Sequence, residues 1–402
     1  MTEKSNAVRP WRKYGHRLIS AIAGLLVIVC AGLVFGAFTP LIPGPIGYGS
    51  LALSLWPAWF IVLPLVSAGL IWRYSSGWFR IAFVILALFA VSGSTVILAR
   101  VISVARANNV QLTFSNAFGF SSSLGVVKPD EVVAYTRDQG DNLTLRIFRP
   151  KGKAPDGGWP VLMHIHGGGW VEGSNSEQSA DMRWFADKGW VVISVGYSLS
   201  NEERHLWDRV HSQIGCAMAW TEANIATRGG DARRLALRGG SAGGNISLNA
   251  AYMANAGTLR SSCGGRIPQV QSVMPVYPGV DLVEIYNNPY PGTAADLRSM
   301  AQRYTGGTPQ QFPERYTAIA SVTHLGPSAP PTLMFMSEND HLVPLASMQK
   351  FGAQVREAGI PLRTVSVPHA EHGFDLTGMG SEIVRQVSLQ FMLKYDRKAV
   401  KR

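Results

Sequence analysis

Three long apolar stretches near the start of the chain constrain its fold more than any other feature. They are Leu18–Phe38, Leu51–Trp72 and Ile81–Ala99, and none contains Asp, Glu, Lys or Arg. Each approaches the roughly 20 residues that cross a hydrocarbon core of about 30 Å. We therefore expect transmembrane helices at about 18–38, 51–72 and 79–99, because such runs are rare in water-soluble folds. The first run is too long for a cleaved signal peptide, so residues 1–110 are expected to stay as an anchor.

Positive charge is concentrated around these stretches. Residues 1–110 hold nine Lys and Arg against the single acid Glu3, a balance of +8 that leaves +3 of the formal +11 for the remainder. Those before the first stretch are Lys4, Arg9, Arg12, Lys13 and Arg17. Because Lys and Arg beside spans stay in the cytoplasm, we expect the N-terminus inside and the rest of the chain after the third span outside, with Arg100 and Arg106 as a weaker opposite signal. The charge reflects membrane topology, so no nucleic-acid partner is expected.

The remaining chain has the rhythm of an α/β domain. After a linker at 111–130, two alternating segments meet at Gly140 and Asp141, which predicts an antiparallel hairpin. Six short apolar runs follow, with helical stretches between them: "PVLMHIH", "WVVISVGY", "RLALRGG", "VQSVMPVY", "PTLMFMS" and "LRTVSVP". Uninterrupted apolar runs indicate a mainly parallel sheet covered on both faces, at residues 131–402. The segment 282–330 is too long for an ordinary connection and is expected to form a lid.

The segment "RLALRGGSAGGNISLNAAYMANAG" contains a candidate nucleophile. An apolar strand runs into G-x-S-x-G, and a helix-forming stretch follows immediately. In this context small residues permit a strained turn that presents a serine hydroxyl above the sheet edge. Chance matches to the motif are common in a chain with 42 Gly, but its position between strand and helix favours Ser241 as a nucleophile.

A candidate acid and a candidate base follow Ser241 in the chain order that this chemistry requires. "PTLMFMSENDHLVP" places Asp340 just after a strand, and Glu338 is the alternative acid. "SVPHAEHGFDL" offers His369 and His372, of which His372 is preferred because Gly-Phe follows it. A carboxylate at Asp340 would fix the tautomer of the imidazole and stabilise its protonated form.

Three consecutive glycines in "VLMHIHGGGWVEG" follow another apolar strand. Backbone N–H groups at such a strand end can bind the oxyanion of a tetrahedral intermediate. We therefore predict an oxyanion hole made by the N–H groups of Gly168, Gly169 and Ala242, with His166 and Trp170 bracing the glycine loop. His164 and His166 also form an H-x-H pair, but no further ligands follow at metal-site spacing, so no metal is predicted.

The motifs "HGGGW", "GGSAGG", "ENDHLVP" and "HGF" together resemble the α/β-hydrolase superfamily, over about Val132–Lys394. Within it the chain resembles carboxylesterases of the hormone-sensitive-lipase-like and feruloyl-esterase-like branches. The resemblance implies an eight-stranded, mostly parallel sheet, the triad Ser241, Asp340 and His372, and no cofactor. Two departures put the branch in doubt: Gly240 stands where an acid usually precedes the nucleophile, and Ser337 replaces a common glycine.

The leading hypothesis is a membrane-anchored serine carboxylesterase or lipase that hydrolyses acyl esters through an acyl-enzyme. An acyl or lipid-like ester substrate is expected from the outer location and from lid aromatics, namely Tyr286, Tyr290, Tyr304 and Phe312. Two alternatives remain: an acyltransferase with the same triad, and a non-catalytic hydrolase-fold binding protein. Cys216 and Cys263 form either a disulfide or two buried thiols, and the sequence does not determine the oligomeric state.

Overall fold

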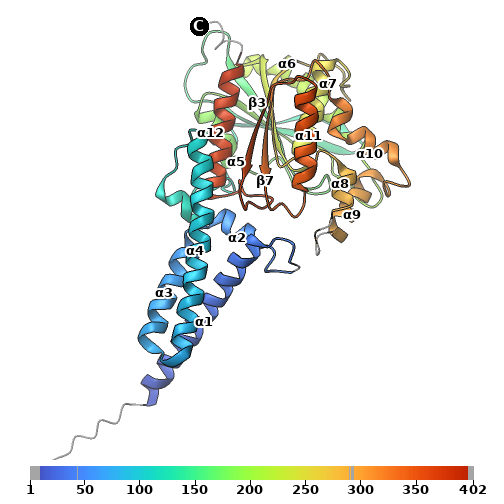
Figure 1. Cartoon of the computed structure of the whole chain (residues 1–402). Coiled ribbons are helices and arrows are strands. Elements are labelled where there is room, and N and C mark those ends of the chain that lie inside the picture. Colours follow the sequence, from blue (N-terminus) through green and yellow to red (C-terminus); the bar gives the residue numbers. More distant parts are fainter. Residues whose placement is uncertain (1–9, 43, 289, 291–293, 397–402) are drawn as a thin grey trace, which may run out of the picture.

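The chain forms a helical stalk that carries an α/β domain at one end (Figure 1). The structure is a computed structural model and describes residues 10–42, 44–288, 290 and 294–396. The stalk helices are α1 (Pro10–Phe38), α2 (Gly49–Leu55), α3 (Trp59–Tyr74) and α4 (Gly77–Ala107). The predicted N-terminal charges Lys4 and Arg9 lie outside the described residues.

The second predicted span is broken into two helices. α2 and α3 meet at an angle of 100°, where the prediction had one helix over 51–72. The break coincides with Trp56 and Pro57, because the residue before a proline is disfavoured in the α conformation. Among the residues that the structure describes, two helical stretches, Tyr14–Phe38 and Gly77–Ala107, are long and apolar enough to cross a membrane, and the bent pair would make a third if it forms one span.

α3 runs back along α1 toward the far end of the stalk. Its last residue Tyr74 packs on His16 with ring centroids 4.7 Å apart, and the Ser75 hydroxyl donates to the Ser20 hydroxyl at 2.8 Å. α4 then returns and continues past the predicted span end at residue 99. Its residues Val101 and Ala105 are buried in the core of the α/β domain, so the end of α4 is part of that core, whereas the rest of the stalk has two hydrophobic clusters of its own.

An eight-stranded sheet organises the α/β domain, in the order β1-β2-β4-β3-β5-β6-β7-β8. β1 pairs antiparallel with β2, β2 pairs antiparallel with β4, and the remaining pairs are parallel. The predicted mostly parallel, eight-stranded sheet is therefore confirmed. The strands are β1 (Glu131–Asp138), β2 (Asp141–Phe148), β3 (Trp159–Ile165), β4 (Val191–Val195), β5 (Gly230–Gly240), β6 (Val270–Val276), β7 (Thr332–Ser337) and β8 (Leu362–Val367).

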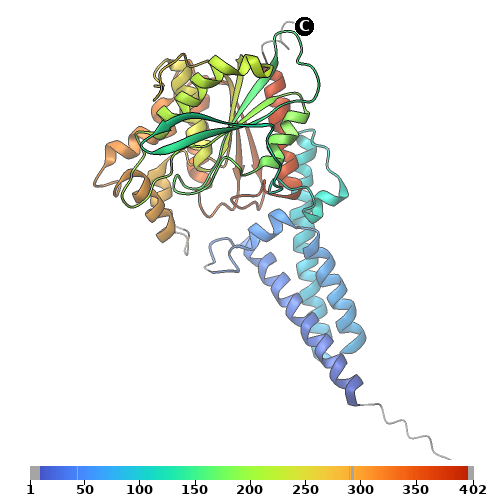
Figure 2. The same cartoon turned by 180° about the vertical axis from the view of Figure 1, so that it is seen from behind.

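Helices cover both faces of this sheet (Figures 1 and 2). α5 (Ser179–Asp187) and α12 (Gly378–Tyr395) contact each other on one face, and α6 (Val210–Asn224) and α7 (Ala242–Ala256) contact each other on the other. α11 (Leu345–Glu357) packs against β7 and β8. Short 3-10 turns complete the chain: η1 (Phe114–Phe118), η2 (Ile225–Arg228) and η3 (Ser321–His324).

The segment predicted as a lid connects β6 to β7. Over its described residues it contains α8 (Leu282–Tyr286), α9 (Ala294–Thr305), α10 (Pro313–Ile319) and η3. α8 and α9 lie beside the carboxyl edge of the sheet, near the stalk (Figure 1). That this segment moves as a lid stays a prediction.

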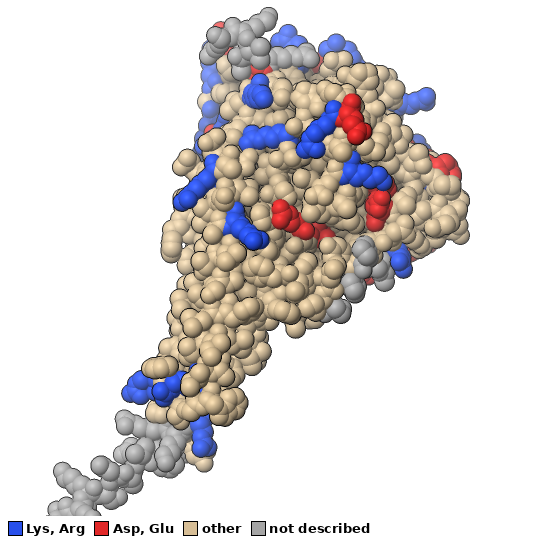
Figure 3. Space-filling view, in the orientation of Figure 1, with Lys and Arg blue, Asp and Glu red and all other residues tan. Residues whose placement is uncertain are grey.

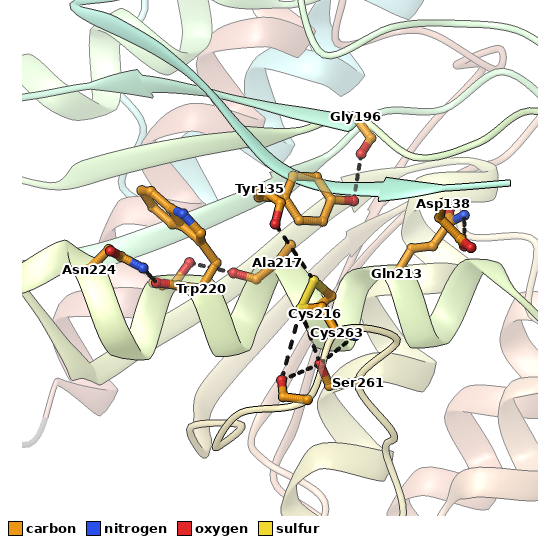
Figure 4. Close-up of a disulfide and its surroundings, with 12 residues drawn as sticks. Tyr135, Asp138, Gly196, Gln213, Cys216, Ala217, Trp220, Asn224, Ser261 and Cys263 are labelled. Atoms are coloured by element: carbon orange, nitrogen blue, oxygen red, sulfur yellow. Dashed lines mark hydrogen bonds between the residues drawn. A yellow bond between two sulfur atoms is a disulfide. The ribbon is translucent and has the colours of Figure 1, made fainter. Parts of the chain in front are cut away.

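A disulfide joins α6 to the loop after α7 (Figure 4). Cys216 and Cys263 are bonded, with their Cα atoms 5.4 Å apart. Cys216 is fully buried, and its neighbour on β1, Tyr135, donates a hydrogen bond to the Gly196 carbonyl at 2.9 Å. The disulfide thus fixes the loop after α7 to a helix that packs against the sheet, and it decides between the two states that the sequence allowed for these cysteines.

Candidate active site

Ser241 occupies the sharp turn between β5 and α7. Its backbone has φ 56° and ψ −122°, a left-handed conformation that is strained for any residue with a side chain. The turn requires glycine at position 243, because a Cβ there would lie 2.2 Å from the Ile165 carbonyl oxygen. β5 is central in the sheet, so this turn holds Ser241 at the carboxyl edge of the sheet.

Asp340 and His372 meet at the ends of β7 and β8. The His372 Nδ1 atom lies 2.9 and 3.1 Å from the two Asp340 carboxylate oxygens. Burial lowers the pKa of His372, but the charge and hydrogen bond of Asp340, aided by Glu371 and Asp375, outweigh burial and raise this pKa above its ordinary 6.5. Nδ1 is thus engaged, which leaves Nε2 for chemistry.

Asp340 is 1% exposed and its carboxylate is fully hydrogen bonded. Besides His372, it accepts from the N–H groups of Leu342 at 2.9 Å and Val343 at 2.8 Å, and from the Ser337 hydroxyl at 2.5 Å. Ser337 was noted in the sequence only as a departure from a common glycine. Its hydroxyl here supplies an extra hydrogen-bond donor that helps to hold the carboxylate in place.

The two rival residues lie elsewhere. Glu338 accepts a hydrogen bond from Ser366 at 3.0 Å and has no contact with His372. His369 faces the stalk: its Nδ1 lies 3.0 Å from the Ala37 carbonyl oxygen, and its Nε2 lies 2.8 Å from Arg100. The geometry therefore brings together the preferred acid and base.

The glycine loop after β3 has an unusual backbone. Gly168, Gly169 and Trp170 all have positive φ, at 105°, 57° and 64°. A Cβ on Gly168 would lie 2.0 Å from the Glu172 carbonyl oxygen, so only glycine fits there. Among the described residues, the N–H groups of Gly168 and Gly169 have no hydrogen-bond acceptor, and that of Ala242 lies in the first turn of α7, where none is available within the helix.

The residues expected to brace this loop are buried beside it. His166 Nδ1 lies 2.8 Å from the Gly167 carbonyl oxygen, and its ring stacks on Tyr197 at 4.2 Å. Burial lowers the pKa of His166 to about 4, against a smaller opposing effect of the Gly167 hydrogen bond, so its ring is neutral at pH 7. Trp170 is 4% exposed and stacks on Tyr304 of α9 at 5.0 Å.

A buried polar network, absent from the sequence predictions, lies beneath the site. Tyr277 packs on the His372 ring at 4.3 Å and donates to the Asp375 carboxylate. Arg238 is 1% exposed, and its guanidinium lies 3.4 Å from Asp181 and 3.5 Å from Asp375. Arg238 directly precedes the G-x-S-x-G motif in an otherwise apolar strand, and a charged residue at such a position is the one sequence signal of buried acidic partners.

Ser241 and His372 line one cavity of about 270 Å³ with no direct hydrogen bond between them. Gly168 and Gly169 also line it. Its apolar wall comes from the segment between β6 and β7 and from the acid loop: Leu282, Ile285, Leu297, Met300, Leu342 and Val343. Its polar wall includes Glu172, Glu177 and Gln178. The cavity lining thus combines mostly apolar side chains with two glutamates.

Known proteins of similar sequence are esterases. The family model BD-FAE matches residues 145–355. The probable carboxylic ester hydrolase LipM of Mycobacterium tuberculosis is 30% identical over 236 residues, which are 58% of this chain and 54% of LipM. The esterase LipQ of the same organism is 30% identical over 254 residues, 62% of this chain and 58% of LipQ. This chain therefore spans little more than half the length of these two relatives.

A third relative and a solved structure agree with this pattern. The ethyl acetate hydrolase of Pseudomonas putida is 27% identical over 278 residues, 66% of this chain and 83% of that protein. The propionate-bound esterase Est2 of Thermogutta terrifontis has a TM-score of 0.54 at 22% identity and covers 66% of this chain and 93% of its own. At that identity the structural similarity supports the fold alone. Because the family model matches more than half of the 402 residues, this chain belongs to the BD-FAE family and is an α/β-hydrolase of the carboxylesterase and lipase type.

Proposed function

We propose that this chain is a membrane-anchored serine ester hydrolase. The observation that carries the proposal is the pairing of His372 with Asp340 in the cavity that Ser241 lines. His372 Nε2 takes the Ser241 proton as Oγ attacks the ester carbonyl carbon. His372 then returns the proton to the alcohol as it leaves, and a water activated by His372 releases the acid from the acyl-enzyme.

The glycine loop supplies the second part of the chemistry. Attack converts the carbonyl oxygen into an oxyanion, and the N–H groups of Gly168, Gly169 and Ala242 are the proposed donors. Preorganised donors of this kind stabilise the developing charge by about 3 to 4 kcal/mol each. Their lack of other acceptors and the positive φ values of the loop support this assignment.

The size of the cavity favours small acyl groups. At about 270 Å³ it lies at the lower end of small-molecule sites, which are about 300 to 1,000 Å³. Apolar side chains such as Leu297 and Met300 suit an alkyl chain, and the neighbouring carboxylates disfavour an anionic substrate. The similarity to an ethyl acetate hydrolase agrees with esters of short acids.

We further propose that the stalk crosses the membrane three times and holds the hydrolase outside the cytoplasm. α1, α3 and α4 lie side by side in both views (Figures 1 and 2). Lys and Arg gather at the stalk end farthest from the hydrolase, below a surface with no visible charge (Figure 3), which suits the positive-inside rule. The Cys216–Cys263 disulfide favours an oxidising compartment.

Replacement of the nucleophile tests the proposed activity. Ser241→Ala in the full chain is expected to lower kcat for p-nitrophenyl butyrate by about a million-fold. Ser247→Ala, six residues further along the chain in α7, is the matched control, since among the described residues the Ser247 hydroxyl bonds only the Gly244 carbonyl. Retention of wild-type hydrolysis by Ser241→Ala would refute the assignment.

A further inference from the structure

Glu371, the residue before His372, joins three segments of the chain at one buried carboxylate. It is 3% exposed. One of its oxygens accepts from the backbone N–H groups of His341 at 2.8 Å and His372 at 2.9 Å. The other accepts from His341 Nδ1 and from the Ser50 hydroxyl at 3.0 Å. Glu371 therefore links three segments. They are the loop after β8 that carries His372 (the loop of the base), the loop after β7 that carries Asp340 (the loop of the acid), and helix α2 of the stalk.

Helix α2 holds Glu371 from two sides. The Ser50 hydroxyl donates to its carboxylate, and the Ser54 hydroxyl accepts from its backbone N–H at 3.1 Å. Ser50 is fully buried, so water cannot replace its hydrogen bond. Five residues after His372, the Thr377 hydroxyl donates to the carbonyl of Leu55, the last residue of α2, at 3.2 Å. The loop of the base is thus bonded to α2 before and after His372.

The loop of the acid is fastened to the stalk in the same way. Asp340 stands between Asn339, which donates to the Ala37 carbonyl at 2.8 Å, and His341, whose Nε2 lies 2.8 Å from the Pro40 carbonyl. Burial lowers the pKa of His341, but Glu371 and the Pro40 carbonyl outweigh it and raise this pKa. Both ring nitrogens of His341 face acceptor oxygens, and its ring packs between Tyr48 of the stalk loop and Tyr290, with centroid distances of 4.6 and 4.7 Å.

We propose that stalk residues 37–55 position the catalytic pair, with Ser50 and Glu371 as positioning residues that fix the distance and angle between Asp340 and His372. The inference rests on the proposed function. Neither Ser50 nor Glu371 lines the catalytic cavity, so each acts through the loop of the base. A shift of about 1 Å at reacting groups costs about 100-fold in rate, so looser loops lower the rate of chemistry while substrate binding is unchanged.

The test compares variants of the full chain in detergent micelles. The probe is p-nitrophenyl butyrate, and kcat is expressed per site titrated with a fluorophosphonate, so that unfolded molecules do not count. Ser50→Ala removes one donor to the carboxylate, Glu371→Ala removes the carboxylate, and Glu371→Gln keeps its shape with one acceptor oxygen. Thr95→Ala is the matched control, because Thr95 lies in α4, outside residues 37–55, and among the described residues its hydroxyl bonds only the Val91 carbonyl.

A graded loss of kcat is expected. Glu371→Ala should lower kcat per site by about 100-fold, Glu371→Gln by less, and Ser50→Ala by about fivefold, the scale of one lost hydrogen bond. KM should stay within about twofold, as expected when only the transition state is affected. Thr95→Ala should match the wild type. If Glu371→Ala does not fold, Ser50→Ala still gives the decisive comparison.

Other results overturn the inference. Wild-type kcat per titrated site in both Ser50→Ala and Glu371→Gln would show that the stalk does not position the pair. A loss confined to the number of titratable sites would assign these residues to folding only. A wild-type chain that hydrolyses no ester and reacts with no fluorophosphonate would refute the proposed function, and the positioning role with it. Failure of the positioning role alone leaves the wild type active, so the two failures are distinguishable.

Discussion

Glu371 and His341 are paired in a buried position between the two loops that carry His372 and Asp340. Each residue of this pair is the chain neighbour of a proposed triad residue, and each also bonds the stalk. The site is thus built on both the hydrolase fold and the stalk. Under the proposed function, the stalk would support the chemistry as well as anchor the hydrolase domain.

The two carboxylates of the acid loop provide a matched pair of substitutions. Asp340→Asn should lower kcat by about 10,000-fold, because an amide stabilises the wrong tautomer of His372 and cannot stabilise its protonated form. Glu338→Gln should change kcat by less than about twofold, since Glu338 bonds only Ser366. Steady-state hydrolysis of p-nitrophenyl butyrate measures both. A larger loss in Glu338→Gln than in Asp340→Asn would reverse the assignment of the acid.

The pH dependence of the reaction should reflect the raised pKa of His372. Only the neutral imidazole accepts the Ser241 proton, so kcat/KM should rise with pH through a pKa above 6.5 and then level off. The free energy of unfolding should depend on pH in the opposite direction. The Asp340–His372 attraction contributes fully to stability below pH 6.5, and this contribution is lost as the pH rises through the raised pKa of His372 in the folded state. A pH–rate profile of the wild type tests the first statement. An acidic limb centred below pH 6.5 would contradict it.

Gly168→Ala should disable the proposed oxyanion hole. The new Cβ would lie 2.0 Å from the Glu172 carbonyl oxygen at a φ of 105°. The loop must therefore move, and its N–H groups would no longer point at the oxyanion. Loss of one such donor costs about 100- to 1,000-fold in kcat. Gly326→Ala is the control, because nothing lies within 4 Å of its added Cβ. Equal kcat values in the two variants would exclude Gly168 from the chemistry.

The disulfide should contribute to stability without affecting chemistry. Cys216 and Cys263 are 47 residues apart in sequence, and loss of a native disulfide typically costs about 2 to 5 kcal/mol. The double variant Cys216→Ala, Cys263→Ala should therefore melt at a lower temperature in detergent, with kcat per titrated site unchanged. Cys30, a free buried cysteine of the stalk, is not part of the disulfide, so reductant should lower the melting temperature of Cys30→Ala as it does that of the wild type. An unchanged melting temperature in the double variant would contradict this role.

Local sequence patterns were sufficient for the α/β domain. Each apolar run became a strand, because a buried parallel strand needs apolar side chains on both faces. The triad candidates Ser241, Asp340 and His372 are also predictable from the sequence, because each follows the end of a predicted strand and they occur in the chain order that the chemistry requires. The break at Trp56 and Pro57 is not predicted by continuous apolarity, because apolarity alone does not distinguish one long helix from two helices that meet at a proline.

The sequence does not predict the polar contacts between residues far apart in the chain. Ser50 bonds Glu371 across 321 residues, and a serine in an apolar stretch carries no sign of a distant carboxylate. Arg238 and its acidic partners likewise come from separate elements. The disulfide needed spatial proximity that spacing does not provide. Such contacts depend on tertiary packing, so only the three-dimensional structure reveals them.

Covalent labelling of the wild-type chain tests the central claim most directly. A fluorophosphonate reacts with a serine only where a neighbouring base activates the hydroxyl, and peptide mass spectrometry then identifies the modified residue. Our account predicts one stoichiometric label on Ser241, lost in Ser241→Ala and strongly slowed in Asp340→Asn. Folded wild-type protein that remains unlabelled, or a label that persists in Ser241→Ala, would contradict the account.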